Sequence, residues 1–447
     1  MVTTQEDTRL MSPTRPTPTD ETRRQLTLHL LDELIAGASA ETVGARLWDG
    51  TRWPDGSVRP ATLVLRRPGA LRAMFLPGTE LALAEAYLYD DVDIEGDVES
   101  VFDLADTIAR ATAGWRRKLR AARDLLRLPA AVGERQTRRG PARLSGRLHS
   151  LERDRQAVTF HYDVSNDFYA LWLDRRMVYS CAYFASPDED LETAQARKLD
   201  YICRKLRLQP GQRLLDIGCG WGGLAIHAAQ HYGVDATGIT LSRPQADLAN
   251  QRIAAAGLAA RCRVLVQDYR QVGAPAGYDA LVSVGMFEHV GATLLPPYFA
   301  QAWRLLRPGG VFLNHGMASR ATDKPQHGPS FSTAYVFPDG ELVPINVTVR
   351  AAEESGFEVR DVESLREHYA LTLRHWVRRL EAHHDDALQC VDEPTYRVWR
   401  LFMSGSAHGF THRRLNIYQV LLAKPDAGGR SGLPLTRTDW YTGTAPA

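Results

Sequence analysis

The stretch Tyr179–Phe184 (YSCAYF) places one cysteine among aromatic and small side chains. Cys181 could be a nucleophile, a metal ligand, a redox-active thiol or an unreactive part of a pocket wall. The chain has 5 cysteines, an odd number, and no two of them have the C-x-x-C spacing typical of zinc sites and redox motifs. We therefore expect neither a disulfide framework nor a metal centre.

A glycine-rich stretch, LLDIGCGWGGLAIHAA (residues 214–229), is the second chemical signal. Its apolar start predicts a buried strand that ends near Asp216. The segment from Gly218 through Cys219 and Gly220 to Gly222 then leads into a helix. Glycine permits a sharp turn and lets a ligand approach the backbone closely. The string resembles motif I of the class I S-adenosylmethionine-dependent methyltransferases. A dinucleotide-binding turn is disfavoured, because no acidic residue ends the second strand.

The elements that must position these residues alternate between strands and helices. Strands are predicted at 213–218, 235–240, 262–268, 278–285 and 311–316. Helices are predicted at 222–233 and 243–257, and residues 294–310 are predicted to be a helix that runs into a turn. This alternation predicts an α/β fold of the class I methyltransferase type, with a mostly parallel, doubly wound sheet covered by helices on both faces.

The carboxyl ends of the second and third strands supply further candidate cofactor contacts, because open α/β sheets bind ligands there. The residues after the second strand are Thr240, Leu241, Ser242 and Gln245. Those after the third strand are Gln267, Asp268 and Tyr269. In a class I methyltransferase fold the first group would lie near the ribose of the cofactor, and the second group near its adenine.

The composition is that of an ordinary globular protein, with 44% apolar residues, 24% charged residues and a net charge of +1. No apolar run reaches the roughly 18 residues that a membrane span needs. The N-terminus lacks the basic-then-apolar pattern of a signal peptide. We therefore expect a cytoplasmic enzyme with no general attraction for nucleic acid.

The chain divides by composition into five parts. We expect a disordered N-terminus (1–20), a small α+β domain (21–113), a basic linker (114–157), a methyltransferase domain (158–425) and a loose C-terminal tail (426–447). Residues 115–157 contain 13 Lys and Arg against 4 Asp and Glu. This excess fits a solvated helix face, and it also fits contact with an anionic membrane. Nucleic acid is disfavoured, because no base-reading module accompanies the charge.

Four further strings join the glycine-rich stretch: FHYDVSNDFY (160–169), YSCAYF (179–184), GMFEHVG (285–291) and FLNHG (312–316). Together they resemble the cyclopropane-fatty-acyl-phospholipid synthase family, which includes the mycolic acid cyclopropane synthases, over residues 156–425. The resemblance implies methyl transfer from S-adenosylmethionine to a cis double bond of an unsaturated phospholipid acyl chain. Loss of a proton to bound bicarbonate would then close a cyclopropane ring. The small domain resembles the extra domain of the phospholipid-acting branch, which implies a role in lipid interaction.

The resemblance also implies the residues of the bicarbonate pocket, carried over position by position. They are Cys181, Glu288, His315, Met317 and Tyr369. Met317 stands where the family usually has isoleucine, and its contact is expected through the backbone. Cys181 would contribute its backbone amide rather than a reactive thiol, while Tyr179 and Ser180 face the cofactor. His289 is expected to point away from the reaction, because Glu288 takes the inward position.

Three alternatives stay open. The same pocket could yield a methyl or methylene branch, if the carbocation is quenched differently. A small-molecule N-methyltransferase could share the domain, but it would need neither the N-terminal domain nor bicarbonate. A lipid-binding protein with a degenerate methyltransferase domain is disfavoured by the intact glycines, Glu288 and His315. The favoured interpretation is a homodimeric enzyme at the inner face of the membrane, held on anionic phospholipid by residues 115–157.

Overall fold

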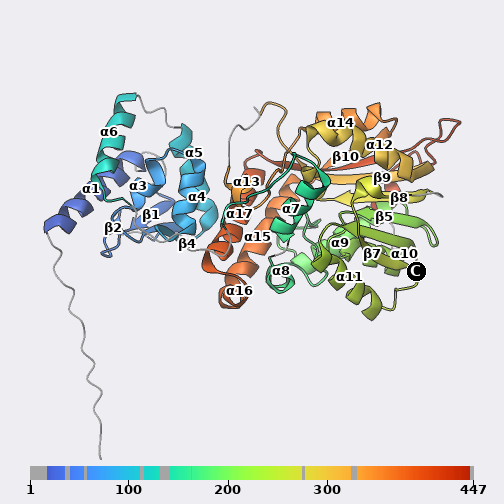
Figure 1. Cartoon of the computed structure of the whole chain (residues 1–447), viewed down its shortest axis with the longest axis horizontal. Helices are drawn as coiled ribbons and strands as arrows, with labels where there is room; N and C mark the ends of the chain where they lie inside the picture. The colour runs from blue at the N-terminus through green and yellow to red at the C-terminus, as the bar shows by residue number, and fades with distance from the viewer. Residues whose placement is uncertain are drawn as a thin grey trace, which may run out of the picture. The chain divides into compact units, whose positions relative to one another are not determined.

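The computed structural model describes residues 18–35, 41–54, 58–110, 115–130, 140–162, 164–273, 277–323 and 330–442. The chain divides into two compact units, residues 1–135 and 136–447. Each unit has its own sheet (Figure 1). Of the expected disordered N-terminus, residues 1–17 lie outside the described part of the chain, and a helix begins at Pro18.

The first unit is a small α+β domain with a four-stranded sheet in the order β2-β1-β3-β4. Its strands are β1 (Val43–Arg46), β2 (Arg52–Trp53), β3 (Ala61–Leu65) and β4 (Val92–Gly96). Its described helices are α1 (Pro18–Leu34), α3 (Ala70–Phe75), α4 (Glu80–Leu88), α5 (Val98–Arg110) and α6 (Trp115–Arg127). Strand β3 is central, parallel to β1 and antiparallel to β4, and α5 contacts both β1 and β3.

The basic segment 114–157 is divided between the two units rather than forming one linker. Helix α6 contacts α1 and α3 and so belongs to the first unit. Residues 151–162 form helix α7 (Leu151–Tyr162) of the second unit. The reason lies in the amphipathic pattern of α6, which buries Ala121 and Leu125 against its own unit. Residues 131–139 of the expected linker lie outside the described residues.

The second unit contains a seven-stranded sheet in the order β10-β11-β9-β8-β5-β6-β7. The strands are β5 (Arg213–Ile217), β6 (Asp235–Thr240), β7 (Cys262–Val266), β8 (Tyr278–Val284), β9 (Leu306–Ala318), β10 (Glu358–Ser364) and β11 (Asn416–Ala423). Strands β5 to β9 pair in parallel, whereas β11 pairs antiparallel with both β9 and β10. The predicted fold class is therefore confirmed. Strand β9 begins at Leu306, so residues 306–310 belong to a strand and not to the predicted helix and turn.

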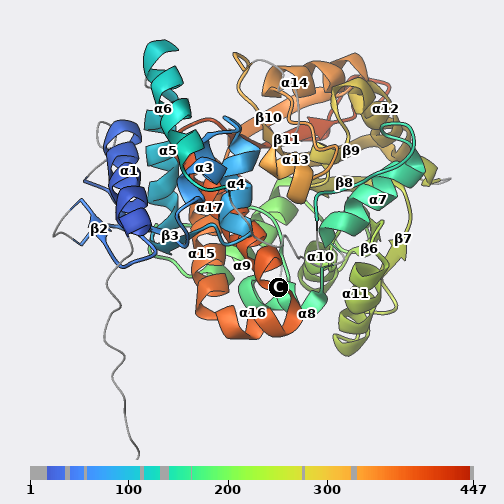
Figure 2. The same ribbon diagram turned by 60° about the vertical axis from the view of Figure 1, so that its left-hand side comes forward.

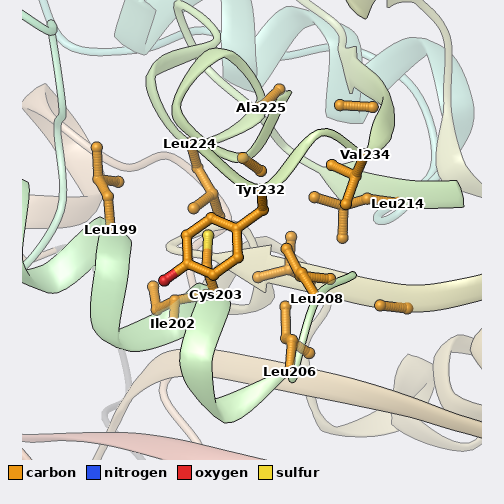
Figure 3. Close-up of a cluster of buried hydrophobic side chains, with 14 of the residues drawn as sticks. Leu199, Ile202, Cys203, Leu206, Leu208, Leu214, Leu224, Ala225, Tyr232 and Val234 are labelled. Atoms are coloured by element: carbon orange, nitrogen blue, oxygen red, sulfur yellow. The ribbon is translucent and has the colours of Figure 1, made fainter. Parts of the chain in front are cut away.

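Helices cover both faces of this sheet (Figure 1). One face carries α9 (Leu191–Lys205), α10 (Gly223–Tyr232) and α11 (Arg243–Ala255), and the other carries α12 (Leu295–Leu305) and α14 (Ile345–Glu354). Successive strand residues alternate between the two cores, so Leu214 packs with the first group and Leu215 with the second. Figure 3 shows Leu199 and Cys203 of α9 gathered around Tyr232 of α10.

A further helical layer adjoins the sheet and was not predicted from the sequence. It consists of α8 (Asn166–Trp172), α15 (Arg366–Ala382), α16 (His384–Cys390) and α17 (Glu393–Thr411). Helices α15 to α17 lie between β10 and β11 in the sequence, and α15 packs along α17 (Figure 2). The core of this layer is aromatic and includes the fully buried Trp172, Trp376 and Trp399.

The expected loose C-terminal tail is anchored to the second unit at Trp440, although most of residues 427–439 are exposed. Trp440 of α18 (Thr438–Thr442) is 3% exposed and belongs to the same core as α9. The ammonium of the buried Lys205 lies 5.3 Å from the centre of the Trp440 ring. Aromatic burial and this cation–π contact hold the segment in place. Residues 443–447 lie outside the described part.

No helix among the described residues has both the length and the apolar composition needed to cross a membrane.

Candidate active site

The turn after β5 holds its backbone in conformations that favour glycine. Gly218 and Gly222 have φ values of 78° and 77°. A Cβ atom at Gly218 would lie 2.6 Å from Cβ of Met286, so no larger residue fits there. Gly220, in contrast, has no atom within 4 Å of the position of a Cβ. The turn therefore presents an open stretch of backbone to a ligand.

A pocket runs along the carboxyl ends of β5, β6, β7 and β8. All the predicted cofactor residues line it except Gly222 and Ser242. The predicted cofactor residues that line the pocket are Tyr179, Ser180, Asp216, Gly218, Cys219, Gly220, Thr240, Leu241, Gln245, Gln267, Asp268 and Tyr269. Gly222 is instead the N-cap of α10. Ser242 is the N-cap of α11, and its hydroxyl accepts a hydrogen bond from the backbone N–H of Gln245.

The polar side chains at the ends of β6 and β7 are fixed by hydrogen bonds to neighbours. The hydroxyl of Thr240 donates to Oε1 of Gln245 at 2.7 Å, and both residues are buried. Arg270 donates to both carboxylate oxygens of Asp268, at 2.8 and 2.7 Å, and also to Asp154 of α7 at 2.8 Å. Helix α7 therefore closes one side of the pocket, although its first turn was expected to be linker.

Helix α9 fixes the segment before Cys181 through two buried side chains. The amide of Gln195 donates to the carbonyl oxygens of Val178 and Ser180, at 3.3 and 2.8 Å. Nζ of Lys198 donates to the hydroxyl oxygen of Ser180 at 2.7 Å. Lys198 is 1% exposed and lines the pocket. Sequence reasoning missed it, because lysine is normally solvated. One indication in the sequence that Lys198 is buried is its place three residues after Gln195, on the apolar face of the helix.

The pocket thus contains two buried groups of opposite charge. Asp216 is 2% exposed, and its Oδ2 atom has no hydrogen-bond partner among the described residues. Burial raises the pKa of Asp216 to about 7, against the opposing effect of Lys198. Burial lowers the pKa of Lys198 to about 8, although the charges of Cys181, Asp174 and Asp216 oppose that shift.

A second group of polar atoms lies at the ends of β8 and β9. Glu288 follows β8 in the short helix η2 (Phe287–His289), and its Oε1 accepts the backbone N–H of Met317 at 2.7 Å. Oε2 of Glu288 and Nε2 of the fully buried His315 have no partner within the described residues. Burial raises the pKa of Glu288 and lowers the pKa of His315 well below its ordinary value, so His315 is neutral. The backbone N–H of Met317 donates to Glu288, and the expected backbone contact of Met317 with bicarbonate stays a prediction.

Cys181 and Tyr369 approach this group from the helical layer. Sγ of Cys181 donates to the carbonyl oxygens of Ala182 and Leu365, at 3.2 and 3.7 Å. Burial raises the pKa of the Tyr369 phenol well above its usual value, and the charge of Glu288 raises it further. Tyr369 is therefore an electrostatic neighbour of Glu288. None of the five predicted bicarbonate residues is among those lining the cofactor pocket in the described part of the chain.

His289 corrects one expectation about this region. It was expected to point away, but it lines the cofactor pocket, whereas Glu288 does not. The physical reason is the tight turn of η2, in which consecutive side chains point in directions about 120° apart. Burial lowers the pKa of His289 to about 4, so its imidazole is neutral.

Comparison with known proteins decides the family. Residues 149–420 match the model of the family described as mycolic acid cyclopropane synthetase. The chain belongs to the mycolic acid cyclopropane synthetase family. A protein of Pseudomonas putida named probable fatty acid methyltransferase is 39% identical over 399 residues, which cover 89% of this chain and 95% of that relative. The family predicted from the motifs is confirmed.

Two further relatives extend this placement in the cyclopropane synthetase family. The cyclopropane-fatty-acyl-phospholipid synthase of Escherichia coli (strain K12) is 36% identical over 299 residues, covering 66% of this chain and 75% of the relative. The mycolic acid cyclopropane synthase CmaA1, solved in complex with SAH and CTAB, is similar in structure, with a TM-score of 0.57 and 34% identity. That similarity covers 60% of this chain and 97% of CmaA1.

The protein is thus an S-adenosylmethionine-dependent methyltransferase of the cyclopropane synthetase family, and its pocket suits that cofactor. The open backbone at Gly220 can lie against a nucleoside without steric conflict. The free carboxylate oxygen of Asp216 can accept a donor from a charged amino group.

Proposed function

We propose that this enzyme transfers a methylene group from S-adenosylmethionine to a cis double bond of an unsaturated phospholipid acyl chain and so forms a cyclopropane fatty acid. The proposal rests on two buried atoms, Oε2 of Glu288 and Nε2 of His315. Neither atom has a hydrogen-bond partner among the described residues. Buried polar atoms normally have partners. Bicarbonate both donates and accepts hydrogen bonds, so it would satisfy a carboxylate and an imidazole together.

The chemistry of the reaction assigns separate tasks to the cofactor and to the protein. S-adenosylmethionine, when bound, supplies an electrophilic methyl group. An alkene is a weak nucleophile, so the protein must hold the double bond close to that methyl, exclude water and accept a proton. Glu288 would receive the bicarbonate hydroxyl on Oε2, because Met317 already fixes Oε1. His315 and Tyr369 would donate to the same anion, and Cys181 would contribute its backbone amide.

Exclusion of water is supported by the aromatic layer behind the pocket. Trp172, Trp376 and Phe410 are each 0% exposed, and Tyr369 packs on Phe410 with ring centres 4.8 Å apart. Tyr162 connects the two parts of the site, since it lines the cofactor pocket and its pKa is raised by burial and by the charge of Glu288. A double bond beside Tyr162 would therefore lie between the cofactor pocket and the proposed base.

Helix α6 supports a membrane-bound substrate. Trp115, Leu119 and Leu126 are 67%, 61% and 55% exposed, and their spacing places them along one stripe of the helix. Arg116, Lys118, Arg120 and Arg123 lie between them in the sequence and are also exposed. Exposed apolar residues with flanking basic residues are typical of helices that lie on anionic membranes. We therefore propose peripheral attachment to anionic phospholipid through α6.

A second candidate function is methyl or methylene branching of the same acyl chains. The relative from Pseudomonas putida, which is covered over 95% of its length, is named a probable fatty acid methyltransferase. Both functions begin with methyl transfer to the double bond. In cyclopropane formation the methyl carbon loses a proton and closes the ring, whereas in a methyl-branched alkene a chain carbon loses the proton. In a methylene branch a hydride shift first moves the cation to the substituted carbon, and the methyl carbon then loses a proton, so the same pocket serves all three outcomes.

One experiment separates these functions. The enzyme is incubated with vesicles of an unsaturated anionic phospholipid and S-adenosylmethionine that carries a fully deuterated methyl group, and the fatty acids are analysed by mass spectrometry and proton NMR. A cyclopropane keeps two deuterium atoms and shows the upfield methine protons of its ring, whereas a methyl-branched alkene keeps three deuterium atoms and shows an olefinic proton. A methylene branch keeps two deuterium atoms but shows neither ring protons nor olefinic protons, because its new double bond ends in CD2. Removal of bicarbonate should slow the reaction, and its return should restore the rate. Lipid left unmodified by cofactor-binding enzyme would overturn both functions.

A further inference from the structure

Lys198 is a buried cation in the cofactor pocket that the proposed reaction leaves without a role. It extends from α9, is 1% exposed and lines the pocket together with Ser180 and Asp216. Its ammonium donates to the hydroxyl oxygen of Ser180 at 2.7 Å. An ammonium has three N–H donors. No second hydrogen bond of Nζ is found within the described chain, so two donors remain available.

Asp216 supplies the charge opposite to that of Lys198 in the same pocket. Its Oδ2 atom is buried and without a partner in the described residues. Among the described residues, no ion pair within 4.0 Å joins Lys198 to Asp216 or to another carboxylate. Each charge nevertheless affects the pKa of the other, so they share one environment. Buried charges without close partners are costly, and a ligand that bears both charges would compensate them together.

We propose that Lys198 and Asp216 bind the amino-acid end of S-adenosylmethionine, with Lys198 on the α-carboxylate and Asp216 on the α-ammonium. The proposal rests on S-adenosylmethionine being the cofactor. The methionyl group carries both charges on one carbon atom, and the opposite orientation would place like charges together. Ser180 adds a third contact. Because its oxygen accepts from Lys198, its own O–H remains free to donate to the same carboxylate.

The test compares ligands with and without the carboxylate and the ammonium of this end. Binding of S-adenosylhomocysteine, decarboxylated S-adenosylmethionine and methylthioadenosine is measured by calorimetry with the wild type, Lys198→Met and Asp216→Asn. Methylthioadenosine keeps the nucleoside and lacks the amino acid. Lys198→Met should weaken S-adenosylhomocysteine binding about 10–100-fold, since charge-assisted hydrogen bonds are lost. It should leave the other two ligands within about twofold. Asp216→Asn should weaken the decarboxylated ligand as well, because that ligand keeps its ammonium.

Controls separate folding from binding. Lys198→Met removes a buried charge, so the thermal stability of the ligand-free variant should not fall sharply. Lys198→Gln serves as a second variant if the methionine side chain packs poorly. Ser180→Ala removes the third contact alone and should weaken S-adenosylhomocysteine less than Lys198→Met does.

Two results would overturn the role of Lys198. Equal weakening of all three ligands would mean that Lys198 only supports the pocket wall. Unchanged S-adenosylhomocysteine binding, together with a raised requirement for bicarbonate, would assign Lys198 to the base site instead. If the wild type binds none of the ligands, the cofactor assignment fails, which is a different outcome from failure of the Lys198 contact.

Discussion

The backbone N–H of Met317 donates to Oε1 of Glu288 at 2.7 Å, so β9 holds the carboxylate that follows β8. The two strands are parallel neighbours, and His315 pairs with Val284, the last residue of β8. His315 and Met317 are two positions apart and point to the same face of the sheet. The end of β9 thus supplies an imidazole nitrogen from a side chain and fixes a carboxylate through a backbone N–H, and both the nitrogen and the second carboxylate oxygen are unpartnered among the described residues.

Glu288→Gln should reduce turnover by about 100-fold or more, because an amide cannot accept the proton from the base. Cofactor affinity should stay within about twofold, since Glu288 does not line the cofactor pocket. Turnover on lipid vesicles and calorimetry with S-adenosylhomocysteine measure the two effects. Glu353→Gln is a suitable control, because Glu353 is an exposed residue of α14. Full activity of Glu288→Gln would remove Glu288 from the proposed base site.

Cys181→Ser should lower activity only partly. Burial raises the pKa of the Cys181 thiol, so the thiolate needed for nucleophilic attack is not formed near neutral pH. Alkylation by iodoacetamide, followed by peptide mass spectrometry, should label Cys181 more slowly than the partly exposed Cys390. Complete loss of activity, with folding and cofactor binding intact, would restore the idea of a nucleophile.

Asp216 should make the stability of the ligand-free protein depend on pH. Its pKa is raised to about 7 in the folded state, whereas an unfolded aspartate titrates near about 4. Between these values the folded state keeps a proton that the unfolded state releases, so this contribution stabilises at low pH. It is lost as pH rises from about 4 to about 7. Asp216→Asn should therefore be more stable than the wild type at pH 7, and the difference should shrink toward pH 4. Thermal melts across this range measure it, and a constant difference would contradict the prediction.

Replacement of Trp115 and Leu119 by alanine should weaken sedimentation with anionic phospholipid vesicles several-fold, because the exposed apolar stripe of α6 is removed. Raised salt should weaken the wild type further by screening the basic residues. Activity on a short-chain, dispersed lipid should not change. Leu148→Ala is the matched control, since Leu148 is 54% exposed but lies in the second unit. Equal loss of vesicle binding in the control would remove α6 as the attachment site.

Much of the fold was predictable, because the strands of the second unit are short apolar runs bounded by glycine and polar turns. The cofactor pocket was also accessible, since its glycines and strand ends are local in sequence. The position of the helical layer α15 to α17 could not be predicted, because it depends on packing between segments that are distant in sequence. The same packing decides how near Tyr369 of α15 comes to Glu288 and Cys181. Lys198 was missed because its burial depends on Ser180 and Asp216, which lie elsewhere in the chain. His289 was misplaced because one step in a tight turn rotates the side-chain direction by about 120°.

The segment Val178–Ala182 has a consequence for engineering the enzyme. The carbonyls of Val178 and Ser180 are held by Gln195 of α9, whereas the Cys181 thiol and the Ala182 amide bond to Leu365 and Thr372. A single stretch of backbone therefore lines the cofactor pocket through residues 178–180 and is bonded to the region of α15 through Cys181 and Ala182. A redesign that enlarges the cofactor pocket by moving this backbone will also displace its contacts with α15. Cofactor range can be altered without disturbing that helix only through side chains that leave this backbone in place.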